Sequence, residues 1–70
     1  MKKALNYSIT WNENDEQKEI LLFSHQEMIR KYIDILENNY NISSLKVWKV
    51  YNQGKEEYTG RLNSFIAYGK

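Results

Sequence analysis

A serine and a glutamate three positions apart, Ser24 and Glu27, have the spacing of a capping box, which fixes where a helix begins. In this motif the serine hydroxyl accepts a hydrogen bond from the glutamate amide, while the glutamate carboxylate reaches back to the serine amide. Phe23 before the cap and Met28 after it are spaced as a hydrophobic staple. The pattern therefore predicts a helix that starts near residue 25, and the rest of the chain is interpreted around it.

The predicted helix covers about residues 25–39. Its apolar residues recur at the i, i+3, i+4 spacing of one helical face, whereas the residues between them are mostly charged or polar. The stripe predicted to be buried comprises Met28, Ile29, Tyr32, Ile33, Leu36 and Tyr40.

Four segments are predicted to form strands. Residues 4–11 alternate between apolar and polar side chains, which is typical of a half-buried strand. Residues 12–17 are all polar and predict a hairpin loop, and residues 18–23 predict the second strand. The third strand is expected at residues 44–51 and the fourth at residues 56–68.

The second hairpin contains residues that favour turns and irregular backbone. A tight turn is expected at Gly54, a bulge at Gly60, and a bend at residues 63–64. In the third strand, Leu45, Val47 and Tyr51 are expected to face the helix, whereas Lys46, Trp48 and Val50 face away. The predicted fold is therefore α+β: a single small domain with the order ββαββ, in which one amphipathic helix packs on one face of an antiparallel four-stranded sheet.

Composition narrows the class of protein. The chain has 70 residues and no cysteine, so its core depends on packing rather than on disulfides. Its ten aromatic side chains are too many for one helix to cover, which predicts an exposed patch that another surface covers. No stretch approaches the length of a membrane span, so we expect a soluble cytoplasmic protein.

The residues do not predict an enzyme, a cofactor or a metal site. His25, the only histidine, falls in the first helical turn and is expected to be an ordinary surface residue. The acidic segment Glu13, Asp15 and Glu16, with Glu19 beyond it, lacks the spacing of a calcium loop and predicts a solvated hairpin tip. Catalytic, cofactor-binding and metal-ligating residues are therefore all predicted to be absent.

The second hairpin carries the candidate partner-binding residues Lys46, Trp48, Lys49, Val50 and Arg61. A tryptophan flanked by lysines on an open sheet suits a protein interface, where tryptophan and arginine are common anchors. The same set suits a single-stranded nucleic acid, because the indole stacks on a base and the cations contact phosphates. A third alternative is that Trp48 belongs to the core.

The size of the chain and its richness in Asn, Lys and Ile without proline resemble small single-domain accessory proteins of low-GC bacteria and their phages. Such proteins often block a larger machine, so the resemblance implies an inhibitor or accessory protein that masks a larger host protein in the host cytoplasm. The leading hypothesis is a non-enzymatic protein-binding module, with self-association as a homodimer a further expectation. The alternative is a module that binds single-stranded nucleic acid through the open sheet face of the second hairpin.

Overall fold

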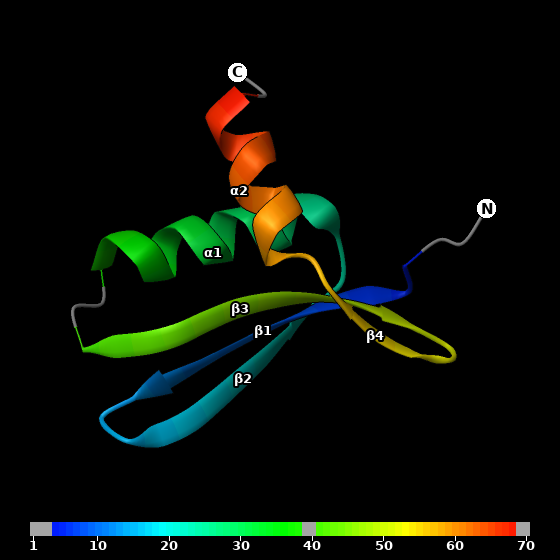
Figure 1. Cartoon of the computed structure of the whole chain (residues 1–70). Helices are drawn as coiled ribbons and strands as arrows, with labels where there is room; N and C mark the ends of the chain where they lie inside the picture. The colour runs from blue at the N-terminus through cyan, green and yellow to red at the C-terminus, as the bar shows by residue number, and fades with distance from the viewer. Residues whose placement is uncertain (1–3, 39–40, 69–70) are drawn as a thin grey trace.

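A four-stranded antiparallel sheet with two helices on one side of it forms the protein in this computed structural model, which describes residues 4–38 and 41–68 (Figure 1). The strands are β1 (Asn6–Glu13), β2 (Glu16–Leu22), β3 (Ile42–Tyr51) and β4 (Gly54–Glu57), and the helices are α1 (His25–Asn38) and α2 (Thr59–Tyr68). The strand order across the sheet is β2-β1-β3-β4. The predicted α+β class and the four-stranded antiparallel sheet are confirmed, and a second helix is added at the end of the chain.

The first hairpin is tighter than the sequence suggested. Its turn consists of Asn14 and Asp15, with φ angles of 52° and 67°, and strand pairing continues up to Glu13 opposite Glu16. Asparagine and aspartate tolerate this left-handed conformation, which two-residue hairpin turns require. The polar side chains of residues 12–17 therefore extend the strands instead of forming a long loop.

The register of β3 settles which side chains share a face of the sheet. Val47 lies opposite Ile9 and is buried beneath the helices, whereas Trp48 lies opposite Ser8 on the other face. An irregularity in the pairing follows Thr10, and there Ser44 adopts a positive φ of 55°. The predicted division of this strand into a helix-facing and an outward-facing side is confirmed at Val47 and Trp48.

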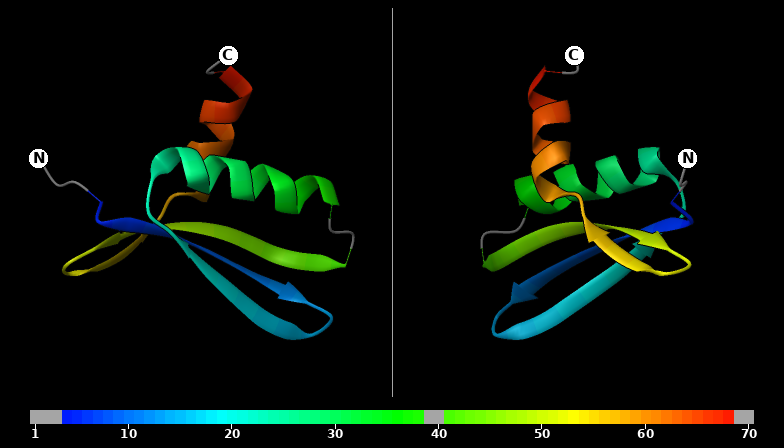
Figure 2. Two further views of the ribbon diagram at one scale, coloured as in Figure 1. Left: turned by 180° about the vertical axis from the view of Figure 1, so that it is seen from behind. Right: turned by 45° about the vertical axis from the view of Figure 1, so that its right-hand side comes forward.

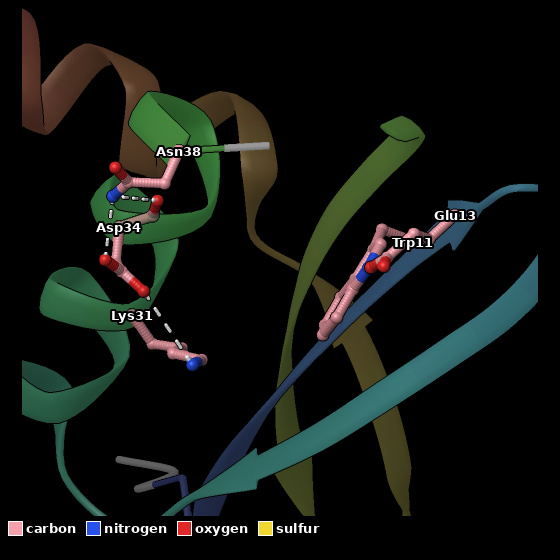
Figure 3. Close-up of polar contacts among 5 residues, drawn as sticks. All are labelled: Trp11, Glu13, Lys31, Asp34 and Asn38. Carbon is pink, nitrogen blue, oxygen red and sulfur yellow. Dashed lines mark hydrogen bonds and ion pairs between the residues drawn. The ribbon is translucent and has the colours of Figure 1, made fainter. Parts of the chain in front are cut away.

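The predicted start of α1 is confirmed by its capping interactions. The Glu27 amide donates to Ser24 Oγ at 3.1 Å, and the Ser24 hydroxyl donates to Glu27 Oε1 at 3.2 Å. The predicted staple is wrong, because Phe23 is 72% exposed while Met28 is fully buried. At the other end, Asn38 Nδ2 donates to the carbonyl oxygen of Asp34 at 3.0 Å and to its carboxylate at 2.9 Å (Figure 3).

Removing the cap should destabilise the protein measurably. We expect Ser24→Ala to lower the free energy of unfolding by about 1 kcal/mol, because the Glu27 amide loses its acceptor and no core contact changes. The shift in the midpoint of urea denaturation measures this loss. An unchanged midpoint would show that the hydroxyl contributes nothing to the start of α1.

The core lies between the sheet and the two helices. Its buried apolar residues come from every element except β4: Ile9, Leu22, Met28, Tyr32, Ile35, Val47 and Leu62. The predicted helical stripe is therefore partly wrong. Ile35 is buried in place of Leu36, which is 52% exposed, and Ile33 is only half-buried. Ile29 packs against the core as predicted, while Tyr40 and the predicted last helical residue, 39, lie outside the described residues.

The predicted fourth strand over residues 56–68 is wrong, because β4 ends at Glu57 and α2 follows. The pairing with β3 continues for one more backbone bond, from the Tyr58 amide to the Val47 carbonyl at 2.7 Å. The Val47 amide then donates a hydrogen bond to the Thr59 hydroxyl at 2.9 Å. If β4 continued, this amide would donate to a backbone carbonyl instead. A side chain thus completes the ladder and frees the backbone to begin a helix.

The predicted bulge at Gly60 and bend at residues 63–64 are accordingly positions inside α2. Leu62 in the second turn is fully buried, and Asn63 Oδ1 accepts the Tyr32 hydroxyl of α1 at 2.8 Å. From this anchored base the helix rises away from the sheet, past α1 (Figure 2). Both helices therefore leave the opposite face of the sheet uncovered.

Candidate functional site

The face of the sheet turned away from both helices is the candidate functional site (Figure 2). Side chains of residues that lie opposite each other on neighbouring strands point to the same side of a sheet. Ser8 lies opposite Leu21 on β2 and opposite Trp48 on β3, so these three side chains share this face, and the other pairs follow by alternation. We call it the open face. By register it comprises Asn6, Ser8, Thr10, Asn12, Gln17, Glu19, Leu21, Ser43, Lys46, Trp48, Val50, Lys55 and Glu57.

Trp48 is the largest side chain of the open face, and it is held in place. Its indole Nε1 donates a hydrogen bond to Thr10 Oγ1 on the adjacent strand at 3.0 Å. The ring is half-buried, and the neighbouring Ser8 is fully buried. Leu21, on the far side of Ser8, is 51% exposed. The centre of the open face therefore presents a positioned aromatic ring beside an exposed aliphatic side chain.

A polar cluster links the two outermost strands across the open face. Glu19 on β2 accepts hydrogen bonds at Oε2 from the Ser8 hydroxyl at 2.7 Å and from Lys55 Nζ at 3.0 Å. Because Lys55 lies on β4, the contact requires the two side chains to reach across β1 and β3. The hydrogen bond from Ser8, followed by the hydrogen bond and positive charge of Lys55, lowers the pKa of the Glu19 carboxyl below its usual value.

This lowered pKa gives a pH dependence with a definite sign. A carboxyl whose pKa is lower in the folded than in the unfolded protein stabilises the fold above its unfolded pKa and loses that contribution as pH falls through its folded pKa. We expect Glu19→Gln to cost about 1 kcal/mol or less near pH 7, because both ionic partners are half-exposed. The difference between the variant and the wild type should shrink in denaturation curves taken toward about pH 3. A difference that is independent of pH would contradict the assignment.

The residues predicted as a partner-binding set do not all lie together. Lys46, Trp48 and Val50 share the open face, as expected. Lys49 points to the opposite side, where its Nζ lies 4.4 Å from the centroid of the Tyr58 ring. Arg61 was expected on a strand beside Trp48, but it belongs to α2 and pairs with Glu56 at 3.4 Å. Two of the predicted cations are thus separated from the indole.

The charges of the open face are balanced. Lys46 and Lys55 supply its positive charges, and Glu19 and Glu57 its negative ones. A surface that follows a phosphate backbone needs an excess of positive charge. The open face has no such excess among its described residues, whereas mixed charge around an apolar centre is common in protein interfaces.

Sequence reasoning missed an aromatic cluster on the helix side. His25 was predicted to be an ordinary surface residue, but it is half-buried, with ring centroids of Tyr7, Tyr58 and Phe65 at 5.7, 6.0 and 5.7 Å. Its Nε2 lies 3.3 Å from the Tyr58 hydroxyl. Burial, with smaller effects from neighbouring tyrosines, raises the pKa of Tyr7. No sequence motif connects these four rings, because each comes from a different part of the chain.

Two acidic residues of the first hairpin, Glu13 and Glu16, contact other side chains of the hairpin. Within residues 4–38 and 41–68, no group of three histidine, cysteine, aspartate or glutamate side chains is arranged to hold a metal ion. The Glu13 carboxylate instead accepts the indole N–H of Trp11 at 3.1 Å, on the helix side of the sheet (Figure 3). Glu16 pairs loosely with Lys18 at 3.9 Å.

The sequence matches no protein-family model and no curated protein, and the fold matches no solved structure. Neither helix in the described part of the chain is long and apolar enough to cross a membrane.

Proposed function

We propose that the protein is a non-enzymatic binding module that docks on another protein through the open face, with Trp48 as its anchor. The observation that carries this proposal is the tethered, half-buried indole on a sheet face that neither helix covers. A ring whose N–H is already bonded to Thr10 loses little conformational freedom when a partner covers it. Partially buried tryptophans surrounded by polar residues are typical hot spots of protein interfaces.

The proposed mode of action is masking. A module of this size inhibits or assists a larger cytoplasmic protein by covering part of its surface, and needs no reacting groups of its own. The chain offers few such groups, since it has no cysteine and its one histidine is packed among aromatic rings. Catalysis by an activated nucleophile and base is therefore not part of the proposal.

Single-stranded nucleic acid is the less favoured partner. Only Lys46 remains beside Trp48 from the predicted cationic set, and two carboxylates share the same face. Stacking on Trp48 stays feasible, but contacts with successive phosphates lack the required cations.

Affinity capture followed by a binding measurement tests the proposal. Wild-type protein, Trp48→Ala and the control Leu36→Ala are immobilised, and a partner retained from lysate is identified by mass spectrometry. Its affinity for each variant is then measured with purified components. We expect Trp48→Ala to weaken binding by about 2 kcal/mol or more, because it removes the anchor at the centre of the open face. Leu36 is more exposed than Trp48 but lies on α1, on the other side of the sheet, so its replacement should leave binding unchanged.

Three outcomes contradict this function. The first is equal binding by wild type and Trp48→Ala. The second is capture of a partner that is lost on nuclease treatment, together with a salt dependence of binding that becomes weaker when Lys46 is replaced by alanine. The third is a Trp48→Ala variant that fails to fold, which would place the indole in the core rather than at an interface.

A further inference from the structure

Strand β2 has seven residues and lies at the border of the sheet. It pairs with β1 on one side, and the backbone groups on its outer edge are not paired with another strand. Its pairing with β1 is continuous from Tyr7–Leu22 to Glu13–Glu16, with no bulge to twist the edge away. The opposite edge strand, β4, has only four residues. Natural sheets usually protect long edges with charged side chains, bulges, prolines or covering segments, since unpaired backbone groups attract another strand. Among the described residues, β2 carries the charged side chains of Glu16, Lys18 and Glu19, but it has no bulge, proline or covering segment.

The backbone groups that face outward can be identified. In an antiparallel ladder, pairs that exchange both hydrogen bonds alternate with pairs that exchange none. A two-residue turn is closed by a bonded pair, which here is Glu13 and Glu16. Counting from that pair, the N–H and C=O groups of Gln17, Glu19 and Leu21 point away from β1.

A shallow, open groove lies at the Leu22 end of this edge, on the helix side of the sheet. It has a volume of about 320 Å³ and is lined by Leu22, Glu27, Arg30, Lys31 and Asp34. Leu22 supplies its apolar floor, and the charged residues of α1 form its wall. We name this feature the edge groove.

We infer that the β2 edge and the edge groove together bind an extended peptide segment of another protein by strand addition. The outward backbone groups satisfy the peptide backbone, and every second peptide side chain points to the helix side of the sheet, where those nearest Leu22 reach the edge groove. An apolar peptide side chain fits over Leu22. No ion pair between described residues involves Arg30, whereas Lys31 pairs with Asp34 at 3.8 Å. Arg30 is therefore the residue that recognises an acidic side chain on the same side of the peptide.

A second copy of this chain fits the edge less well than such a peptide does. The antiparallel register that pairs all seven residues of two β2 strands places Glu19 directly opposite its own copy. Like charges opposite each other destabilise a sheet. The strand-addition site is distinct from the anchor of the proposed function, because its backbone contacts lie on the outer edge of β2 and its recognition residues Leu22 and Arg30 lie on the helix side, whereas Trp48 lies on β3.

A random library of displayed peptides of about ten residues, long enough to cover the edge strand, is the probe. Selection on the wild-type protein should enrich peptides with an apolar and an acidic residue two positions apart. Amide exchange measured with one such synthetic peptide should show new protection at Gln17, Glu19 and Leu21. Because this measurement uses the wild-type protein, it does not depend on any variant being folded.

Substitutions at the edge and in the edge groove sharpen the test, with Leu21→Thr as the matched control for Leu21→Pro. Leu21→Pro removes an outward N–H and should weaken peptide binding about tenfold, whereas Leu21→Thr keeps it and should stay within about threefold. Arg30→Glu should shift the preference to peptides with a basic residue in place of the acidic one. Trp48→Ala should leave peptide binding unchanged, which separates this site from the open face.

The inference is overturned if no peptide is enriched or if the protection falls on β3 and the open face. It is also overturned if peptide binding is lost in Trp48→Ala. Protection of the β2 amides that rises with protein concentration in the absence of peptide would identify a second copy as the occupant and would equally overturn it.

Discussion

Replacing Ile35 with alanine is expected to lower the free energy of unfolding by about 2–5 kcal/mol, a large part of the total stability of so small a domain. Ile35 is almost fully buried between α1 and the sheet, together with Met28 and Tyr32. The substitution removes apolar contacts and leaves a cavity that rigid neighbours fill only partly. Thermal and urea denaturation of the purified variant measure the loss.

The neighbouring residue supplies the matched control. Leu36 is also a large aliphatic residue of α1, but it is 52% exposed. Leu36→Ala should therefore change stability by about 0.5 kcal/mol or less. Equal losses for the two variants would mean that α1 is buried on all sides, most simply inside an oligomer.

Leu62→Ala is expected to have an effect of similar size, about 2–5 kcal/mol, with a local signature. Leu62 is the one fully buried residue among the described side chains of α2, so it is the main apolar anchor of that helix. Hydrogen exchange should show the largest loss of protection in α2, with a smaller loss in β1 and β2. Arg61→Ala, at the preceding position of the same helix, is the control, because Arg61 makes an exposed ion pair.

Uniform loss of protection across all elements in Leu62→Ala would contradict a separately anchored α2. Retained protection in α2 would show that the Thr59 and Asn63 hydrogen bonds suffice to hold it in place.

The elements that local patterns specify strongly were predicted well. The capping box at Ser24 and Glu27 located the start of α1 at the correct residue, because its two bonds join groups only three positions apart. Strict alternation at residues 4–11 similarly located the body of β1, and alternation within β3 placed Trp48 on the open face. These signals depend on neighbours along the chain and need no tertiary information.

The wrong predictions concern features that depend on contacts between residues far apart in the sequence. Leu62, Phe65 and Ile66 have the i, i+3, i+4 spacing of a helix, but Gly60 and the preceding strand favoured a continued strand with a bulge. What ends β4 is the Thr59 hydroxyl bonded to Val47, a contact between residues twelve positions apart. The choice of Ile35 over Leu36 depends on the rotation of α1 against the sheet, which the apolar pattern of the helix alone left open.

The candidate site was predicted only in part for the same reason. Lys46, Trp48 and Val50 were correctly grouped, since alternation along one strand is enough to group them. Arg61 was misplaced with the fourth strand, and Lys49 was grouped by sequence proximity although adjacent strand residues face opposite sides. The Glu19–Lys55 contact joins the outermost strands and has no counterpart in any local pattern.

The two tryptophans lie on opposite sides of one sheet, and this gives the protein two separate optical reporters. The Trp11 indole N–H bonds to Glu13 on the helix side, whereas that of Trp48 bonds to Thr10 on the open face. Loosening of the helix layer should therefore change the emission of Trp11, and docking on the open face that of Trp48. Single-tryptophan variants that replace one indole by phenylalanine would separate the two signals, so unfolding and partner binding are observable independently without an added dye.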